Sequence, residues 1–266
     1  MRPKLKDDAE AIIKDFIGQK VEESGGNGVV VGLSGGLDSA VVAVLSVQTI
    51  GAERVLCINM PSDSSPPNDL EDSRELTGLF GMELKVLRIS EPVAALTHVL
   101  PSTDRKDLMG NVMARCRMIL LFHHANLMGR VVMGTSNKSE LLVGYFTKFG
   151  DGGSDFLPIG DLYKTEVREL AMRIGIPEHM IEKPPSAGLW TGQTDEGEMD
   201  VSYEDLDMIL IGFEMGLPPG NIVAETGLDP QLVERIWNRY LSTVHKRKMP
   251  LIPKLGIRTV GLDWRE

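Results

Sequence analysis

The segment from Val29 to Ser39 most constrains the fold of this 266-residue chain, because it joins a β-branched run, two adjacent glycines and an apolar stretch of helical character. A strand that passes through a short glycine loop into a helix is a phosphate-binding arrangement in α/β proteins. The glycines let backbone N–H groups turn toward a pyrophosphate, and the helix N-terminus adds a favourable dipole. The glycines are adjacent and no Lys follows them, so the segment is neither a P-loop nor a G-x-G-x-x-G loop.

Asp38 stands in this loop, where a carboxylate repels phosphate unless a cation lies between them. Its simplest use is to bind Mg²⁺ that bridges the phosphates. The alternative is a structural turn in which Ser34 or Asp38 caps the following helix, since both residue types favour that position.

The order of periodic segments predicts an α/β fold, a parallel twisted sheet with helices on both faces and a helical C-terminal subregion. Short apolar runs predict strands over residues 29–31, 55–59, 84–89 and 130–133. Apolar residues at helical spacing predict helices over 5–21, from about 38, from about 68, and over 108–127, 164–173, 203–212 and 230–245. Neither a repeat nor a linker composition divides the chain, so we expect a single domain over residues 1–266.

Charge and cysteine content narrow the function classes. Lys plus Arg total 28 and Asp plus Glu 38, and the resulting net charge of −10 disfavours broad binding of nucleic acid. No apolar run approaches the roughly 20 residues of a membrane span, and the N-terminus mixes charges of both signs, unlike a signal peptide. We therefore expect a cytoplasmic protein with no membrane or nucleic-acid partner. Cys57 and Cys116 lack the spacing of a metal site or disulfide framework.

A second loop follows the fourth expected strand and reads Gly134-Thr135-Ser136-Asn137-Lys138-Ser139-Glu140. If the first and fourth strands are neighbours, this loop faces the glycine loop, and Glu140 can share a metal ion with Asp38. The alternative is a capping box, in which Ser136 or Asn137 caps a helix and Glu140 is its acidic partner.

Several strings resemble a known family. Ser34-Gly35-Gly36-Leu37-Asp38-Ser39 resembles the SGGxDS loop of the ATP pyrophosphatases, which have the adenine nucleotide alpha-hydrolase-like fold and cleave ATP to AMP and pyrophosphate. The string FTKFGDGGSD, residues 146–155, resembles the FTKxGDGGxD segment of the NAD synthetases. The resemblance continues in residues 158–165, 185–190, 193–196 and 245–247.

Two departures from the NAD synthetase pattern leave its charged groups in place. Ser186 stands where related enzymes often have Thr, and Ser136-Asn137-Lys138 replaces the Asp-His-Ala of some bacterial members. The glutamine-using members carry a large N-terminal amidase domain, for which 266 residues leave no room. The resemblance is therefore to the ammonia-dependent type.

The resemblance implies a ligase that forms a carbon–nitrogen bond in the last step of NAD biosynthesis. The nicotinate carboxylate of deamido-NAD attacks the α-phosphorus of ATP, pyrophosphate leaves, and ammonia then displaces AMP. The implied cofactor is Mg²⁺, bound by Asp38 and Glu140. The implied ATP-binding residues are Gly32, Leu33, Ser34, Gly35, Gly36, Leu37, Asp38, Ser39, Thr135, Lys164 and Ser186.

The resemblance also implies sites for the other two substrates. The residues implied to bind deamido-NAD are Arg115, Lys148, Asp155, His245 and Lys246. Asp151 is implied to bind ammonium, and the implied catalytic set is Asp38, Glu140, Lys164 and Asp151.

Plainer interpretations stand beside these assignments. Arg115 can form a surface pair with a carboxylate, and Lys148 and Lys164 can be solvated loop charges. Another ATP pyrophosphatase, of the GMP synthetase or tRNA-modifying type, is an alternative function, and a nucleotide-binding sensor without turnover is a third. The sequence has no CxxC pair or basic patch, which speaks against the tRNA type.

Two further expectations concern a loop and the assembly. Residues 184–200 form a long unpatterned stretch, which we expect to become ordered when ligand binds. The helix over 108–127 is apolar around much of its circumference, more than one sheet face requires. We therefore expect a homodimer, with the deamido-NAD site near or across its interface.

Overall fold

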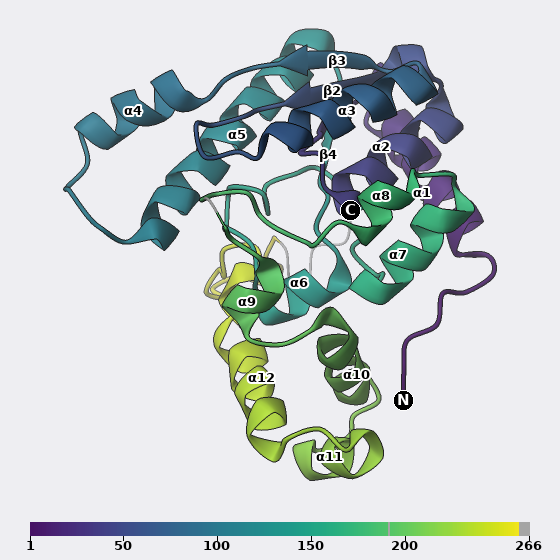
Figure 1. The fold of residues 1–266 in the computed structure, drawn as a ribbon, viewed down its shortest axis with the longest axis vertical. Coiled ribbons are helices and arrows are strands. Elements are labelled where there is room, and N and C mark those ends of the chain that lie inside the picture. Colours follow the sequence, from purple (N-terminus) through teal and green to yellow (C-terminus); the bar gives the residue numbers. More distant parts are fainter. Residues whose placement is uncertain (191, 261–266) are drawn as a thin grey trace.

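The computed structural model describes residues 1–190 and 192–260, arranged as a sheet layer covered by helices with a helical lobe below it (Figure 1). The strands are β1 (Val29–Gly32), β2 (Val55–Asn59), β3 (Glu83–Val86) and β4 (Val131–Met133). The helices up to β4 are α1 (Ala9–Glu23), α2 (Leu37–Ile50), α3 (Pro67–Phe80), α4 (Ser90–His98) and α5 (Lys106–Met128). Those after it are α6 (Lys138–Val143), α7 (Lys164–Arg173), α8 (Glu178–Glu182), α9 (Asp195–Met199), α10 (Tyr203–Glu214), α11 (Pro219–Thr226) and α12 (Pro230–Ser242). Two 3₁₀ turns, η1 (Ala52–Arg54) and η2 (Val244–Lys246), complete the element order.

The four strands form one parallel sheet in the order β3-β2-β1-β4, which confirms the predicted fold class. In its register Val30 of β1 lies opposite Leu56 of β2 on one side and Val132 of β4 on the other. From β1 the chain adds β2 and then β3 on one side of this strand, and it then returns to add β4 on the other side of β1. Such a reversal leaves a crevice at the carboxyl ends of the two neighbouring strands, where α/β proteins bind ligands.

Both faces of the sheet are buried under helices. Val29 and Val31 of β1 pack with α1, α2 and α7 in one apolar cluster. Val30 points to the opposite face and packs with the α5 residues Met113 and Cys116 in a second cluster. Alternate residues of a strand point to opposite faces, so a continuous Val run is what a sheet covered on both sides requires.

The predicted helical C-terminal subregion is confirmed as a lobe with its own apolar cluster. Helices α6, α10, α11 and α12 contribute to this cluster, in which Tyr203, Leu206, Ile209 and Ile236 are buried. The lobe hangs below the sheet layer (Figure 1). Because α6 follows β4 directly, the lobe connects to the sheet at the crevice.

Some predicted elements differ from the structure. The first helix starts at Ala9, not at residue 5, although Leu5 is buried as part of the segment that leads into it. β3 ends at Val86, but the Leu87 and Ile89 N–H groups still donate to the Asn59 and Pro61 carbonyls at 2.9 and 3.0 Å. Helices α4, α8, α9 and α11 were not expected, and α9 lies inside the stretch predicted as a loop. Among the described residues no helix is long and apolar enough to cross a membrane.

Candidate active site

A cavity of about 1250 Å³ opens at the carboxyl ends of β1, β2 and β4. Its walls come from the glycine loop after β1, the start of α3, one side of α5, the segment after β4, and residues from 183–190 and 192–198. Pockets for one small molecule usually measure roughly 300–1,000 Å³. The cavity is therefore large enough for more than one small substrate.

The glycine loop is built so that only backbone fits at its turn. Gly35 has a φ of +82°, and a Cβ there would lie 2.3 Å from the carbonyl oxygen of Asp69 on α3. The Ser34 and Ser39 hydroxyls lie 3.1 Å apart, and the Ser39 Oγ donates to the Gly36 carbonyl at 2.9 Å. The N-cap of α2 is Gly36 without a side-chain cap, so the alternative in which Ser34 or Asp38 caps this helix is wrong.

The first turn of α2 offers its N–H groups to the cavity. Leu37, Asp38 and Ser39 are the first residues of this helix and all three line the cavity. N–H groups in a first turn have no carbonyl partner within the helix, and they carry the positive end of its dipole. The loop and the helix start together can bind phosphate oxygens through backbone groups.

Asp38 and Lys164 form an ion pair inside this cavity. Lys164 is the first residue of α7, and its side chain is only 3% exposed. Its Nζ donates to Asp38 Oδ2, while Asp38 Oδ1 accepts a hydrogen bond of 3.0 Å from Asn137 Nδ2. Burial alone would lower the pKa of Lys164, but the carboxylates of Asp38 and Glu140 outweigh it and raise the pKa. The alternative that Lys164 is a solvated loop charge is wrong.

Glu140 takes part in the N-terminal cap of α6 and also lies near the carboxylate of Asp38. Its backbone N–H donates to Asn137 Oδ1 at 3.0 Å, and its Oε2 accepts from the Asn137 N–H at 3.3 Å, so the capping box is present. Burial and the neighbouring Asp38 charge raise the pKa of Glu140 well above its usual range, while Lys164 opposes this rise. Glu140 therefore forms the predicted capping box and also lies near Asp38, as the order of the strands predicts.

The donor set fits a magnesium ion that phosphate oxygens share. Within the described ranges no group of three or more His, Cys, Asp or Glu side chains could hold a metal on its own. Mg²⁺ is typically bound by one or two carboxylates, with water and substrate phosphates completing the octahedron. Two carboxylates, Asp38 and Glu140, line the cavity beside the phosphate-binding loop, which meets that requirement.

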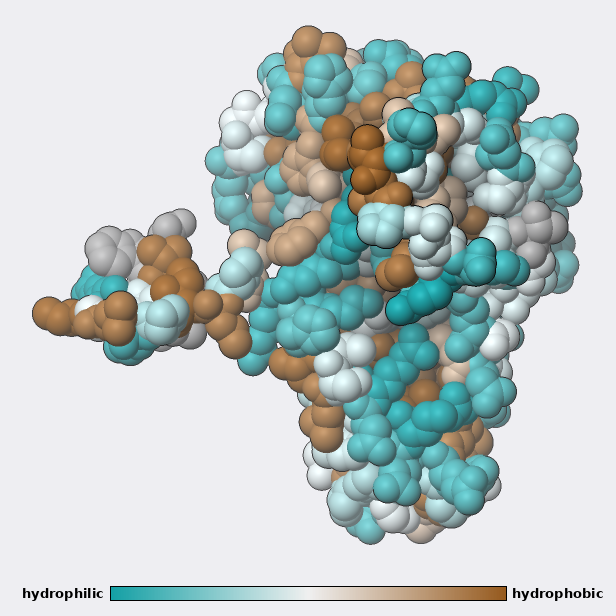
Figure 2. Space-filling model, turned by 90° about the vertical axis from the view of Figure 1, so that its left-hand side faces the viewer, coloured by the Kyte–Doolittle hydropathy of each residue, from teal (hydrophilic) through white to brown (hydrophobic). Residues whose placement is uncertain are grey.

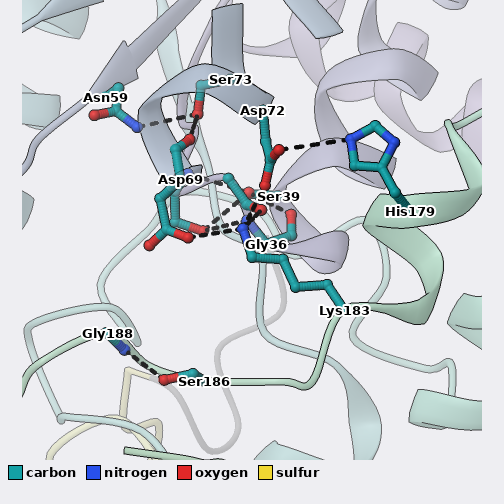
Figure 3. A network of polar contacts seen from close by, with 12 residues as sticks. Gly36, Ser39, Asn59, Asp69, Asp72, Ser73, His179, Lys183, Ser186 and Gly188 are labelled. Carbon is teal, nitrogen blue, oxygen red and sulfur yellow. Dashed lines mark hydrogen bonds and ion pairs between the residues drawn. The ribbon is translucent and has the colours of Figure 1, made fainter. Parts of the chain in front are cut away.

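The other predicted ATP residues also meet at this cavity. Gly32, Leu33, Thr135 and Ser186 all line it, as do Lys164 and most of the glycine loop. The Ser186 hydroxyl donates to the Gln193 carbonyl at 2.8 Å. It also accepts the Gly188 N–H at 3.1 Å (Figure 3). It is held within its own loop in this structure. Thr191 of that loop lies outside the described residues.

The predicted deamido-NAD residues fall into three places. Lys246 lines the cavity and donates to the Gly144 carbonyl. Arg115, Lys148 and His245 form a chain of contacts beside it, since the Arg115 Nη2 donates to the Lys148 carbonyl at 3.3 Å and the Lys148 Nζ to the His245 carbonyl at 2.8 Å. Asp155 accepts the Val132 N–H at 2.7 Å at the edge of β4. Their part in binding stays a prediction.

Asp151 also lines the cavity, in the glycine-rich segment after β4. Its Oδ1 accepts the Thr147 N–H at 2.8 Å, which fixes the turn that carries the segment. The position is open to a substrate on the cavity side, and the ammonium role assigned to Asp151 stays a prediction.

The sequence analysis did not assign Asp195, Arg117 or Lys183, which are three of the charged residues that line the same cavity. Asp195 at the start of α9 is buried, accepts bonds from Tyr145 and Tyr203 at 3.1 and 3.2 Å, and adds its charge to the Lys164 cluster. Arg117 on α5 donates to the Met60 carbonyl at 3.1 Å, and Lys183 donates to the Gly35 carbonyl of the glycine loop at 3.2 Å. Their positions in the sequence could have indicated two of them. Lys183 directly precedes Pro184-Pro185-Ser186, and Asp195 lies in the string 193–196 that resembles the NAD synthetases.

The sheet order, the glycine loop and the carboxylate pair define an α/β enzyme class that binds nucleotide phosphates at the carboxyl edge of a parallel sheet. The model of the NAD synthase family matches residues 10–250. This match covers well over half of the chain, so the protein belongs to the NAD synthase family.

Curated relatives match over nearly their whole length. The NH(3)-dependent NAD(+) synthetase of Methanococcoides burtonii is 47% identical over 249 residues, which are 93% of this chain and 95% of that protein. The protein of the same name from Pyrococcus horikoshii is 46% identical over 91% of this chain and 93% of its own.

Solved structures show the same fold. An NH3-dependent NAD synthetase from Campylobacter jejuni, solved with a nitrate ion, superposes with a TM-score of 0.79 at 35% identity, over 92% of this chain and 97% of its own. An NMN synthetase from Francisella tularensis gives a TM-score of 0.82 at 35% identity over the same shares. Because this neighbour is named for a mononucleotide product, a functional test should include a mononucleotide substrate as well as a dinucleotide.

Proposed function

We propose that this protein is a ligase that converts deamido-NAD and ammonia to NAD, with cleavage of ATP to AMP and pyrophosphate. Family membership and the near full-length relatives support this function. The single observation that carries it is the Asp38–Lys164–Glu140 cluster beside a phosphate-binding loop in one large cavity.

The chain's own residues can support adenylation. A carboxylate is a poor acyl donor, so the nicotinate carboxylate first attacks the α-phosphorus of ATP and pyrophosphate leaves. The N–H groups of the glycine loop and of the first turn of α2 bind the phosphate oxygens that gain charge. Lys164 lies next to Asp38 with its ammonium buried, where a positive charge stabilises the departing pyrophosphate.

Asp38 and Glu140 would hold Mg²⁺ against the triphosphate. When bound, the ion would neutralise negative charge on the reacting phosphorus and on the leaving group. Burial and the charge of Asp38 penalise the charged form of Glu140 and raise its pKa. A cation bound between the two carboxylates would offset this penalty.

Ammonia then attacks the carbonyl carbon of the adenylate, the bond to the AMP oxygen breaks, and the extra proton of the nitrogen passes to a base. Asp151 is our candidate for binding ammonium. Arg115, Lys148, Asp155, His245 and Lys246 are our candidates for binding deamido-NAD, and four of these five carry or can carry positive charge suited to its pyrophosphate.

We also propose a homodimer. Leu108, Ile119 and Leu127 on α5 are 41%, 57% and 73% exposed, although α5 already covers one sheet face. Residues 249–260 add further exposed apolar side chains, Met249, Leu251, Leu255 and Ile257 among them. Figure 2 shows an arm with apolar residues that stands away from the body of the protein. Equilibrium sedimentation at micromolar concentration should give twice the monomer mass, and a monomer would contradict this proposal.

The reaction is tested by mixing purified protein with ATP, Mg²⁺, deamido-NAD and ammonium, and by measuring NAD, AMP and pyrophosphate as each component is omitted. Equal amounts of the three products, lost on omission of any component, are the expected result. Parallel reactions replace deamido-NAD by nicotinate mononucleotide or by xanthosine monophosphate, and ammonium by glutamine. Turnover with one of these instead of deamido-NAD or ammonium would overturn the proposed substrate pair. A single domain over 1–266 and a cytoplasmic location stay predictions.

A further inference from the structure

The ammonium group of Lys183 lies where three segments of the chain meet. It donates to Asp69 Oδ1 at 2.7 Å, to Asp72 Oδ2, and to the carbonyl oxygen of Gly35 at 3.2 Å. Figure 3 shows the Lys183 side chain reaching from the segment after α8 to the carboxylates of α3, beside Gly36 and Ser39. One side chain thus joins α3, the glycine loop and the segment that leads to Ser186.

The Lys183 ammonium binds the carbonyl oxygen of the peptide bond that joins Gly35 to Gly36. This peptide has more rotational freedom than the others of the loop. Gly35 and Gly36 flank this bond, and glycine has no Cβ to limit rotation of the peptide plane. The carbonyl of Gly35 and the N–H of Gly36 belong to one planar peptide, so they point in opposite directions. Lys183, which also lines the cavity, binds the Gly35 carbonyl oxygen, and this leaves the N–H of Gly36 directed away from the lysine ammonium.

A reversed peptide would be harmful at this position. Rotation by half a turn would bring the Gly35 carbonyl oxygen to the side of the loop where phosphate binds, and two negative groups would then face each other. The Gly36 N–H currently donates only to the Ser34 hydroxyl, at 3.2 Å. This weak bond does little to hold the peptide, so the bond from the charged Lys183 is the stronger restraint.

Lys183 also fixes the start of the loop that carries Ser186. Helix α8 ends at Glu182, and Pro184 and Pro185 separate Lys183 from Ser186. Two consecutive prolines restrict φ at both positions, so the spacer between the anchored lysine and the serine is stiff. A fixed Lys183 therefore limits where the Ser186 hydroxyl can lie relative to the glycine loop.

We propose that Lys183 is a positioning residue for ATP, which holds the Gly35–Gly36 peptide in the phosphate-binding orientation and anchors the Ser186 loop to it. This role rests on the proposed function, since ATP is the ligand whose phosphates the loop would bind. The competing explanation is an ion pair that serves stability alone, because Asp69 and Asp72 need a cation between them. His179 Nε2 lies 3.5 Å from Asp72, and the charge of Arg117 also interacts with Asp69.

The test compares two variants that separate the backbone contact from the ion pair. Lys183→Met removes both, whereas Asp72→Asn weakens the ion pair and leaves the contact with Gly35. ATP binding with Mg²⁺ but without deamido-NAD is measured by calorimetry, and the KM values of both substrates are measured in turnover. Lys14→Met is the matched control, because Lys14 on α1 is also paired, with Glu10, and is 29% exposed against 26% for Lys183.

For Lys183→Met we expect ATP affinity to fall at least about tenfold, as for the loss of one hydrogen bond from a charged group, with the KM for deamido-NAD little changed. For Asp72→Asn and Lys14→Met we expect ATP affinity within about threefold of the wild type. Equal losses in Lys183→Met and Asp72→Asn would assign the effect to the ion pair and overturn the proposal. If Lys183→Met does not fold, Lys183→Met/Asp72→Asn, which also removes one of the two uncompensated carboxylates, carries the same expectation.

The two proposals fail in different ways. If the wild type makes NAD but Lys183→Met binds ATP as well as the wild type, the role of Lys183 is wrong and the function stands. If the wild type binds ATP and makes no NAD, the function is wrong, while a loss of ATP affinity in Lys183→Met still supports the role of Lys183.

Discussion

The ammonium of Lys164 lies on the carboxylate of Asp38, although 126 positions separate the two residues in the chain. Asp38 belongs to the first turn of α2 and Lys164 to the first turn of α7, and both helices pack on the same face of the sheet. Two helix starts therefore meet at the crevice between β1 and β4. A buried lysine held by carboxylates in this position is the feature from which the first two predictions follow.

Asp38→Asn removes one charge of the carboxylate pair while keeping a side chain that can still contact Asn137. We expect the rate of NAD formation to fall at least about a hundredfold, the size of loss seen when one group that stabilises developing charge is removed. The check is a single-turnover assay across a Mg²⁺ titration. Asp38→Glu, which keeps the charge, should retain more activity, and equal activity in Asp38→Asn and the wild type would contradict the assigned role.

Lys164→Met leaves Asp38 and Glu140 without their shared cation. Removing one partner of a buried ion pair costs about 3–5 kcal/mol of unfolding free energy, because the other charge stays buried and unpaired. Chemical denaturation measures this loss. Mg²⁺ together with ATP should restore part of the lost stability, since the ion replaces the missing positive charge. A variant as stable as the wild type without ligand would show that Lys164 does not offset the two carboxylates.

Asp207 predicts a pH dependence of stability. It is buried, and its carboxylate accepts bonds from the Ser139 hydroxyl and, at 2.9 Å, from the Thr165 N–H. Burial raises its pKa from 3.8 to about 6. Between about pH 4 and pH 6 the folded protein therefore holds a proton that the unfolded chain has released, so this residue's contribution to stability falls as pH rises. The total is about 3 kcal/mol.

Asp207→Asn stays neutral and removes this dependence. Urea unfolding of both proteins from pH 4 to pH 7 should show the wild type losing about 3 kcal/mol relative to the variant as pH rises. Parallel stability profiles over this interval would show that Asp207 has an ordinary pKa in the folded protein.

Gly35→Ala tests the close approach between the glycine loop and α3. A Cβ at Gly35 would lie 2.3 Å from the Asp69 carbonyl oxygen, and the φ of +82° is unfavourable for alanine. We expect a loss of about 1–3 kcal/mol in unfolding free energy, together with weaker ATP binding. Gly78→Ala on α3 is the control, because nothing lies within 4 Å of its Cβ position, and it should stabilise the protein by about 0.5–1 kcal/mol.

The sequence predicts best those helices and strands whose own apolar pattern is clear without knowledge of their tertiary contacts. The strand Val55–Asn59 and the helix Lys164–Arg173 have the bounds that their sequences indicate, since the strand is a continuous buried run and the helix has apolar residues at helical spacing. For the edge strand β3 the sequence predicts residues 84–89, whereas the strand spans Glu83–Val86, because its side chains are only partly covered and its pattern is weak. Helix α9 has only five residues after its Thr194 cap, which is too short for a periodic signal, so the sequence predicts a loop there.

The site was predictable where local sequence and strand order act together. The glycine loop is a continuous string, and the pairing of β1 with β4 brings Glu140 to the same cavity as Asp38, as expected. The bond between Asn137 and Asp38, the contacts of Lys183 and the bond between Tyr145 and Asp195 join residues far apart in sequence. No spacing rule links such residues, since their proximity results from how whole helices pack.

The capping box of α6 has a consequence for how substitutions at Glu140 are interpreted. One oxygen of this carboxylate accepts the Asn137 N–H, and Asn137 in turn donates to Asp38. Replacing Glu140 would therefore fray the start of a helix and shift a neighbour's amide at the same time as it removed an acid. A loss of turnover at this position reports on chemistry only after the helical content and melting temperature of the variant have been matched to those of the parent protein.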